Sequence, residues 1–483
     1  MWRQIFKNII HKVLFISIIF CVSCASNKTN NLDVLYAKSA KQSDLYRNPV
    51  IVIPGILGSK LYDTETGNET WGIFNNQFTN PSTPEKARLV ALPIEQNKPL
   101  SELKDSIESN GALDKIKFKL LGIPLESRAY ASILGTLGVG GYRDETLSRS
   151  GAVNYDSDHF TCYQFHYDWR RSNVENAAEL DKFIKSKRKL VRAKMKEKFG
   201  VDKKDIKFDI VAHSMGGLLT RYYMRYGDQP LPANGSLPAL TWAGAKNVDN
   251  VILVGTPSHG SILAFKELLN GKYFAPKWLS AIQGTNLPSY PAEVLGTYPS
   301  IYELMPRVRH GAFVANTGKP LNIYDVSLWK ENKWGLLGQS KQDKLSWLLP
   351  NISDKASRLA VAEEHVEKSL RNAEQFHKSL DRKTNSFPKH VKLTLIAGDS
   401  IQTKEKIELN LTTGAIKDLA DSPGDGVVLR SSVIADDRLG VSDSKRVDSP
   451  IPYTSAIFLP NDHLNLTKDR VFSDNVLHKL LEE

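Results

Sequence analysis

The stretch Ile210-Val-Ala-His-Ser-Met-Gly-Gly-Leu-Leu-Thr220 is the most informative part of this chain for its fold. An apolar run enters a group of small residues, and a segment with helical character follows. This is the pattern small-x-Ser-x-Gly, in which a serine occupies a strained turn between a strand and a helix with its hydroxyl exposed. Small neighbours are needed because the turn brings backbone segments close together, and Ala212 still fits where a glycine is usual. The pattern predicts that Ser214 is a nucleophile; the alternative is a structural serine in a tight turn.

Short apolar runs recur along the chain, with helical stretches between them. They lie at 50–53, 160–165, 208–211, 251–254, 391–396 and 456–459. Runs that are apolar throughout, rather than at alternate positions, are typical of strands buried on both faces of a parallel sheet. Apolar residues spaced three and four apart predict amphipathic helices at 177–199 and 357–380. Together with the serine turn, this pattern predicts an α/β chain of the α/β-hydrolase fold, a mostly parallel sheet covered by helices, with cap or lid insertions.

A serine hydroxyl is a weak nucleophile near neutral pH, so a base must take its proton and a carboxylate must orient that base. In this fold the order along the chain is serine, acid, histidine. His463 comes just after the last predicted strand, where the fold places the base. His365 and His377 lie in the helix predicted at 357–380 and are expected at the surface. The other downstream histidines are His259, His310, His390 and His478.

Two aspartates are candidates for the acid. Asp425 lies between two glycines, which free the backbone to aim a short carboxylate at the imidazole. Asp399 directly follows the strand predicted at 391–396, and this position favours it. The residues themselves leave both aspartates open.

An oxyanion needs two backbone N–H donors, one from the residue after the nucleophile and one from a loop that follows an early strand. Met215 is the residue after the nucleophile. The second donor is expected in Val50-Ile-Val-Ile-Pro-Gly-Ile-Leu-Gly-Ser59, an apolar run that enters a Pro-Gly turn, with Ile56 as the donor.

Six blocks of the sequence resemble the lecithin:cholesterol acyltransferase family, whose members include acyltransferases and phospholipases A. In chain order they are Ile53-Pro-Gly-Ile-Leu-Gly-Ser59, Tyr167-Asp-Trp-Arg170, residues 212–217, Gly255-Thr-Pro257, residues 424–428 and His463-Leu-Asn465. The resemblance implies an acyl-enzyme on Ser214 and a glycerolipid or phospholipid acyl ester as donor. It also favours Asp425 over Asp399 as the acid, gives His463 the role of base, and gives Ile56 and Met215 the oxyanion roles. The tetrad at 167–170 is expected to form a packed ion pair beneath the site.

Three functions follow from these residues. The favoured one is a serine-dependent acyl-ester hydrolase or O-acyltransferase that acts on a lipid, with a membrane surface as a further expected partner. The second is an esterase or lipase for soluble esters or neutral lipids that transfers no acyl group to an alcohol. Pocket shape and water exclusion, rather than the triad, select the acceptor. The third is a non-catalytic binding or effector module on the same fold.

The first 25 residues differ in composition from the rest of the chain. Basic residues precede an apolar run, 13–22, which ends in the small residues Ser23, Cys24 and Ala25. This predicts an export signal at 1–25, followed by a polar segment at 26–47. The product is then periplasmic or secreted, or, in a bacterial host, anchored to a membrane through a lipid on Cys24.

The rest of the chain is predicted to form one core with insertions. Residues 48–264 form its first part, with a lid loop near 62–80 that contains Trp71. Residues 265–350 are rich in proline and glycine and lack a clean period, which predicts a cap or lid insertion; the alternative is an ordinary peripheral subdomain. Residues 351–483 complete the core and carry the acid and the base.

Composition excludes several classes of function. The net charge of +11 is largely concentrated in basic residues between 182 and 207, where a solvated helix face or attraction to anionic lipid is expected. Basic and aromatic residues do not interleave as in nucleic-acid readers, so no nucleic acid is expected as a partner. Cys162 is the only cysteine after the signal, and the histidines lack close ligand spacing, so neither a metal site nor a cofactor is expected. Nothing in the sequence indicates an oligomeric state.

Overall fold

The computed structural model describes residues 31–71, 81, 83–112, 116–120, 123–127, 130–150, 152–155, 161–273, 289–338, 343–384, 386–438 and 446–483. The predicted export signal at 1–25, with Cys24, lies outside the described residues, and so do residues 72–80 of the predicted lid loop. None of the helices within these ranges has the length and apolar character that crossing a lipid bilayer requires.

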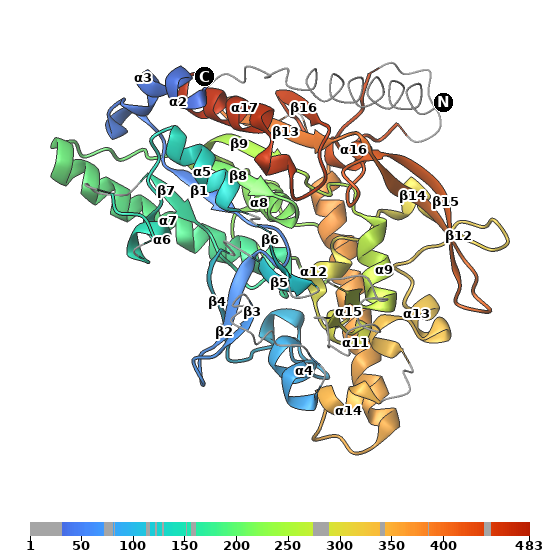
Figure 1. The fold of residues 1–483 in the computed structure, drawn as a ribbon. Coiled ribbons are helices and arrows are strands. Elements are labelled where there is room, and N and C mark those ends of the chain that lie inside the picture. The colour runs from blue at the N-terminus through green and yellow to red at the C-terminus, as the bar shows by residue number, and fades with distance from the viewer. Residues whose placement is uncertain are drawn as a thin grey trace, which may run out of the picture.

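Six parallel strands form the central sheet, in the spatial order β16-β13-β9-β8-β1-β7 (Figure 1). Their bounds are β1 (Val50–Ile53), β7 (Cys162–Gln164), β8 (Phe208–His213), β9 (Val248–Val254), β13 (Lys392–Gly398) and β16 (Ser455–Leu459). Each of the six apolar runs predicted as strands contributes one of them. The prediction of an α/β-hydrolase fold with a parallel sheet is confirmed.

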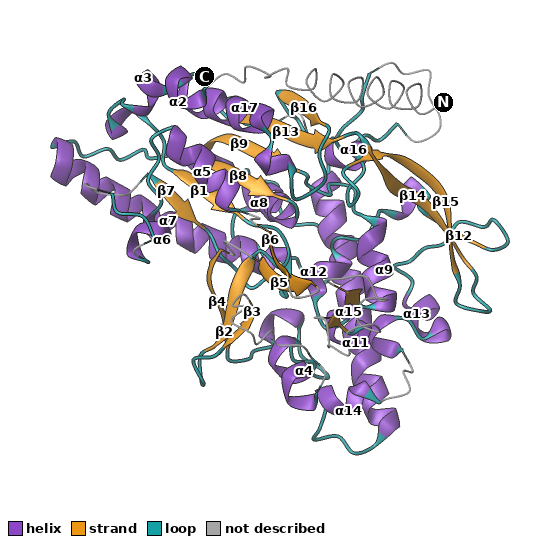
Figure 2. Ribbon diagram, in the orientation of Figure 1, coloured by secondary structure: helices purple, strands orange, loops and turns teal. Residues whose placement is uncertain are grey.

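Helices cover both faces of this sheet, as Figure 2 shows. Those that contribute to its two core clusters include α5 (Ala131–Val139), α7 (Asn173–Phe199), α8 (Met215–Tyr226), α15 (Lys355–Asp381) and α17 (Arg470–Leu481). Val52 and Val211 share a core cluster with side chains of α5 and α17. Ile53 and Ile210 belong to a second cluster that contains side chains of α7, α8 and α15. Neighbouring residues of a strand thus enter opposite clusters, and burial on both faces explains the continuous apolar runs.

The two amphipathic helices predicted from the sequence are present as α7 and α15. Ser172 caps α7 by accepting the N–H of Val174, and Gly200 ends the helix with φ of 71°. Asp354 caps α15 by accepting the N–H of Ser357. These caps satisfy amides that have no partner inside the helix, and glycine supplies the left-handed conformation that ends many helices.

Four smaller sheets lie outside the central one in the described chain. Their strands are β2 (Ser59–Asp63), β3 (Glu69–Trp71), β4 (Ile107–Ala112), β5 (Ile116–Leu120), β6 (Ile123–Ser127), β10 (Lys272–Tyr273), β11 (Ser289–Tyr290), β12 (Phe313–Ala315), β14 (Ile401–Leu409) and β15 (Ile416–Gly424). The other α-helices of the described chain are α2 (Leu32–Leu35), α3 (Ala37–Ala40), α4 (Pro84–Val90), α6 (Glu145–Arg149), α9 (Ile262–Asn270), α11 (Ala292–Leu295), α12 (Pro299–Tyr302), α13 (Val326–Asn332), α14 (Lys344–Leu348) and α16 (Arg430–Val433).

The stretch 265–350 begins inside α9 and packs around a group of aromatic rings. Phe265 meets Trp329 and Trp334 edge to face, with ring centroids 5.9 and 5.4 Å apart. Trp329 is completely buried. Such packing is consistent with a peripheral subdomain as well as with a cap, so the cap at 265–350, like the other predicted domain boundaries, stays a prediction.

The segment Tyr167–Arg170 supports the loop that follows β1. The hydroxyl of Tyr167 donates to the carbonyl of Pro54 at 2.8 Å, and the indole of Trp169 donates to the carbonyl of Ser59 at 3.1 Å. Both ends of the Pro-Gly loop are therefore fixed by side chains from β7's carboxyl side.

The charge of Arg170 is fully buried but fully paired. Its guanidinium lies 2.8 Å from a carboxylate oxygen of Asp168 and 2.8 Å from one of Asp105. The packed ion pair predicted for this tetrad is confirmed, and removing one partner would leave an uncompensated charge in the interior.

Candidate active site

Ser214 forms the turn between β8 and α8. Its backbone has φ of 55° and ψ of −126°, a conformation that residues with a side chain rarely adopt. The N–H of Ser214 donates to the carbonyl of Val254 at 2.8 Å, which ties the turn to the neighbouring strand. A side chain at Gly216 would meet the carbonyl of Pro54 at 2.5 Å, so the glycine two residues after the nucleophile is a steric requirement. The turn exposes the serine side chain to the cavity at the carboxyl edge of the sheet.

The structure brings Ser214, His463 and Asp425 together in one hydrogen-bonded line. The Oγ of Ser214 lies 2.9 Å from Nε2 of His463, and Nδ1 of that ring lies 2.7 Å from Oδ2 of Asp425. With the proton on Nδ1, His463 donates to the carboxylate and its Nε2 accepts the serine hydroxyl. This arrangement can take the proton from the serine as its oxygen attacks an acyl carbon.

The carboxylate of Asp425 is held from both sides. Its Oδ1 accepts the backbone N–H groups of Val427 at 3.0 Å and Val428 at 2.7 Å, while Oδ2 faces His463. Burial opposes the charge, but His463 and the two amides more than offset it and lower the pKa of Asp425 below its ordinary value. The backbone N–H of His463 also donates to the Asp425 carbonyl at 3.0 Å, which fixes the two loops relative to each other.

The alternative acid, Asp399, is not part of this line. Its carboxylate is partly exposed and lies 3.6 Å from Arg430, and no hydrogen bond or ion pair joins it to His463 in the described chain. The reason is a hairpin inserted after β13. Strands β14 and β15 leave and return so that Ile401 pairs with Gly424, and the chain arrives beside β13 again with Asp425.

Of the predicted oxyanion donors, Ile56 lies in the loop that faces Ser214 and Met215 follows Ser214 in the chain. Ile56 lines the cavity within the turn closed by the hydrogen bond from Gly58 N–H to Gly55 O. Met215 is the first residue of α8, where helical N–H groups point outward without a partner and the helix dipole favours negative charge. A side chain at Gly55 would meet the Cβ of Ser214 at 2.7 Å, so the loop and the nucleophile touch.

His213 and Tyr130 were not singled out by the sequence, and they connect the base to this loop. Nε2 of His213 donates to the carbonyl of His463 at 3.0 Å, and its Nδ1 lies 3.3 Å from the hydroxyl of Tyr130. That hydroxyl accepts the N–H of Gly55 at 2.8 Å. Burial, together with the neighbouring ring of His463, lowers the pKa of His213 to about 3, so this residue stays neutral. Adjacency to Ser214 was a usable signal for His213, whereas nothing in the sequence marks Tyr130.

A cavity of about 460 Å³ opens onto the serine. Its size lies in the range typical of small-molecule sites. Apolar side chains dominate its wall, among them Leu57, Leu263, Ala264, Leu304 and Val427. A chain of methylene groups would be accommodated well beside the nucleophile.

The expectation that His365 and His377 are surface residues is wrong. Both are buried, and their Nε2 atoms pair with the carbonyls of Thr297 at 3.0 Å and Glu303 at 2.7 Å. Helix α15 contacts α8 on one side and α12 on the other, so its buried stripe is wider than the apolar spacing suggests. Neither histidine approaches Ser214.

One group of potential metal ligands lies apart from the hydrogen-bonded line of Ser214, His463 and Asp425. Within the described ranges, one group of histidine and acidic side chains has the spacing of metal ligands, His259, His310 and Asp437. None of these three side chains belongs to the hydrogen-bonded line.

Comparison with known proteins gives one family and one fold. The family model described as lecithin:cholesterol acyltransferase matches residues 145–399, just over half of the chain, a range that contains Ser214 and ends before Asp425. A chain of the Tle4–Tli4 complex has a TM-score of 0.56 and 16% identity over 90% of this chain and 98% of that one, a likeness that concerns the fold alone. The mature lipase BlEst2 of Bacillus licheniformis, with 13% identity, covers 91% of this chain and 94% of its own, but its TM-score of 0.29 supports no argument. No curated protein sequence matches this chain.

Replacing each candidate acid by asparagine in turn tells which of the two aspartates is the catalytic acid. Asp425→Asn keeps the shape of the side chain but cannot hold His463 in the same tautomer, so turnover of a short-chain chromogenic ester should fall about 10⁴-fold. Asp399→Asn loses only a partly exposed ion pair and should keep nearly full turnover. Loss of activity in the Asp399 variant with retention in the Asp425 variant would reverse the assignment.

A methyl group at Gly55 tests the contact between the loop and the nucleophile. Gly55→Ala must displace the loop or Ser214, and misplacement by about 1 Å should lower kcat on the order of 100-fold. Gly135→Ala in α5 is the matched control, because a methyl group there meets no atom within 4 Å. Steady-state kinetics and thermal unfolding of both variants give the readout, and an unaltered kcat in Gly55→Ala would show that the close contact is unimportant.

Proposed function

Because this chain belongs to the lecithin:cholesterol acyltransferase family, we propose that it is a serine-dependent acyl-ester hydrolase or O-acyltransferase that acts on glycerolipids or phospholipids. The observation that carries the proposal is the unbroken line from Asp425 through His463 to Ser214, which ends at an apolar cavity. A lipid acyl chain would bury apolar surface in that cavity, and burial of that kind is favourable at about 25 cal/mol per Å².

In the acylation step, Oγ of Ser214 attacks the acyl carbonyl carbon while Nε2 of His463 takes the hydroxyl proton. The resulting positive charge on the imidazole is stabilised by Asp425, which stays ionised. The N–H groups of Ile56 and Met215 stabilise the negative charge that develops on the carbonyl oxygen. The tetrahedral intermediate collapses, the ester C–O bond breaks, and His463 returns its proton to the departing alcohol. An acyl group remains on Ser214.

In the deacylation step, water or an alcohol attacks the acyl-enzyme. His463 removes a proton from the attacking hydroxyl and then returns one to Ser214, which regenerates the free serine. Water yields a fatty acid, and an alcohol yields a new ester. His213 stays neutral near neutral pH, because its pKa is about 3. Its Nε2–H therefore donates to the carbonyl of His463 throughout the reaction.

The same side chains would serve an esterase or lipase that uses water alone. That alternative differs only in what reaches the acyl-enzyme, because the attacking group occupies the same position in both reactions. A purely non-catalytic module is the weaker candidate, since a strained serine aligned with a base and a buried acid is the arrangement that nucleophilic catalysis requires.

We also propose that the chain is exported, on the sequence evidence of residues 1–25. The processed protein would be released, or would be held at a membrane surface through a lipid on Cys24.

The acyl-enzyme is directly observable. Incubation of the protein with a phospholipid of defined acyl composition, followed by rapid acid quench, should yield one acyl adduct by intact mass spectrometry, on the peptide that contains Ser214. Ser214→Ala should lose both the adduct and acyl release while its thermal unfolding stays close to that of the wild type. An adduct on a different residue, or turnover retained by Ser214→Ala, would refute the mechanism.

Product analysis identifies whether water or an alcohol accepts the acyl group from Ser214. With a phospholipid that carries a labelled acyl chain, the protein alone should release labelled fatty acid. Adding a sterol or a fatty alcohol should divert label into the corresponding ester in proportion to the alcohol concentration, because water and alcohol compete for one intermediate. Fatty acid as the sole product at every alcohol concentration would leave the water-only hydrolase as the function.

A further inference from the structure

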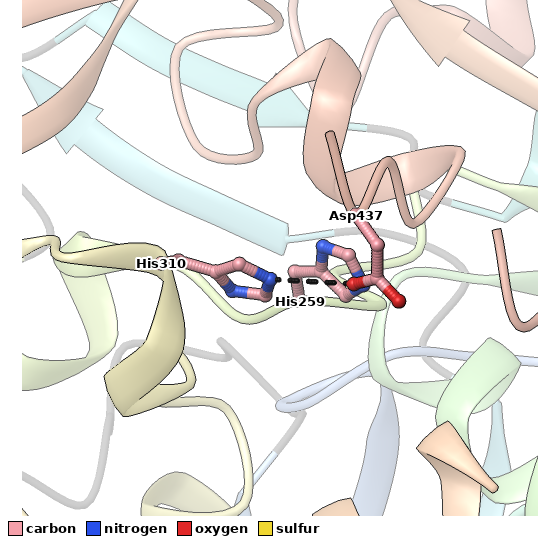
Figure 3. A group of neighbouring side chains, drawn as sticks. All are labelled: His259, His310 and Asp437. Carbon is pink, nitrogen blue, oxygen red and sulfur yellow. Dashed lines mark ion pairs between the residues drawn. The ribbon is translucent and has the colours of Figure 1, made fainter. Parts of the chain in front are cut away.

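Three side chains with metal-ligand chemistry converge outside the active site. His259 lies in the loop between β9 and α9, His310 ends a short helical turn that precedes β12, and Asp437 follows α16 (Figure 3). The sequence predicted no metal site, because these residues are far apart along the chain and only folding brings them together. Figure 3 shows the two rings side by side, facing one carboxylate.

The distances among the three groups are close to those of a metal site. Nε2 of His259 lies 3.4 Å and Nε2 of His310 lies 3.7 Å from Oδ1 of Asp437. One potential ligand atom from each of the three residues lies within 4.8 Å of the others. Two ligands of a tetrahedral zinc ion, at bond lengths near 2.0–2.1 Å, are separated by about 3.3 Å. Small side-chain rotations would therefore bring the three groups into contact with one ion.

Within the described residues, the Nε2 atoms of both imidazoles are buried and have no hydrogen-bond partner. In the described chain, neither His259 nor His310 has a hydrogen bond at that atom, although their ring centroids lie only 4.0 Å apart. His259 is 5% exposed. A neutral imidazole offers a lone pair from such a nitrogen, as a metal ligand must.

Asp437 can bind a cation and keep its ion pair with Arg309. Nη2 of Arg309 donates to its Oδ1 at 2.9 Å, while Nη1 of the same guanidinium is held by Asp381 at 2.8 Å. Arg307 is also paired with Asp381, at 3.1 Å. A carboxylate has about four lone-pair sites on two oxygens, so Asp437 can keep the arginine and bind an ion. Hydrogen bonds of this kind to a liganding carboxylate orient it and are a common part of metal sites.

We propose that His259, His310 and Asp437 bind a divalent transition-metal ion, with zinc as the ion that this donor set favours. Two imidazole nitrogens and a carboxylate oxygen suit zinc, whereas calcium and magnesium prefer oxygen ligands alone. The two histidines line a second cavity of about 410 Å³, which gives the ion an entry path and room for a water as fourth ligand.

A bound ion would connect two loops that flank the acid. The backbone N–H of His259 donates to Oγ of Ser432 at 3.1 Å, and that hydroxyl donates to the carbonyl of Gly260 at 2.8 Å. Ser432 lies in α16, which begins just after the two amides that hold Asp425. The ion would add a further connection between these loops and stabilise the folded chain without contacting the substrate.

Metal content tests the proposal independently of any enzymatic activity, so its failure and the failure of the proposed function are distinguishable. The full chain, purified without a histidine tag, is treated with a chelator and then titrated with Zn²⁺ in competition with a chromophoric chelator. We expect one Zn²⁺ per chain, no binding of Mg²⁺ or Ca²⁺ at the same concentration, and a melting temperature that rises with Zn²⁺. His310→Ala and Asp437→Asn should each weaken binding at least about 10-fold, since even changes beyond the ligands cost that much. His478→Ala, which removes an exposed imidazole from α17, is the control and should bind as the wild type does.

A second measurement needs no variant. Zn²⁺ should protect His259 and His310 of the wild-type protein from acylation by diethyl pyrocarbonate, with no protection of His478, as read by peptide mass spectrometry. Absence of bound zinc in the wild type, equal affinity in the ligand variants, a preference for Mg²⁺ or Ca²⁺, or equal modification of His310 with and without zinc would each overturn the proposal.

Discussion

The left-handed backbone of Ser214 is the constraint on which the rest of the site depends. A residue with a side chain in such a conformation costs about 1–3 kcal/mol, which the surrounding sheet must offset. The hydrogen bond from Ser214 to Val254 and the start of α8 directly after the serine hold the turn in place. This turn leaves no room for side chains at Gly55 and Gly216. The oxyanion loop can therefore lie directly against the nucleophile.

A chain of neutral polar groups couples the base to that loop. The carbonyl of His463, the ring of His213, the hydroxyl of Tyr130 and the N–H of Gly55 follow one another in hydrogen-bond contact. Each such bond contributes roughly 1 kcal/mol net, but leaving one member unpaired in the interior costs about 1–3 kcal/mol. The chain is stable only when complete, so it fixes the separation between the proton acceptor and the loop that faces the developing negative charge. Neutral His213 suits this role because a charged ring would repel the imidazolium that forms on His463.

The sequence predicted the parts of this structure that depend on local pattern. Continuous apolar runs located all six strands of the central sheet, because a strand buried on both faces is apolar at successive positions. Residue types alone left Asp399 and Asp425 open, because a strand end looks the same whether or not a hairpin follows it. The positions of His365 and His377 were predicted wrongly, since the width of a helix's buried stripe is set by neighbours that the helix's own sequence does not show.

The hairpin that separates the two aspartates also changes what holds the acid in place. An acid at the end of β13 would be positioned by the sheet itself, whereas Asp425 sits in a loop beyond β15 and is aimed by the amides of Val427 and Val428. That loop is attached to the rest of the molecule through the hydroxyl of Ser261, which donates to the carbonyl of Val427 and also caps α9. Misplacement of a catalytic group by about 1 Å costs on the order of 100-fold in rate, so contacts between these two loops affect catalytic efficiency through the position of Asp425. His259 and Asp437 of the proposed metal cluster lie on the continuations of these two loops, so an ion bound between them would act on the position of the acid.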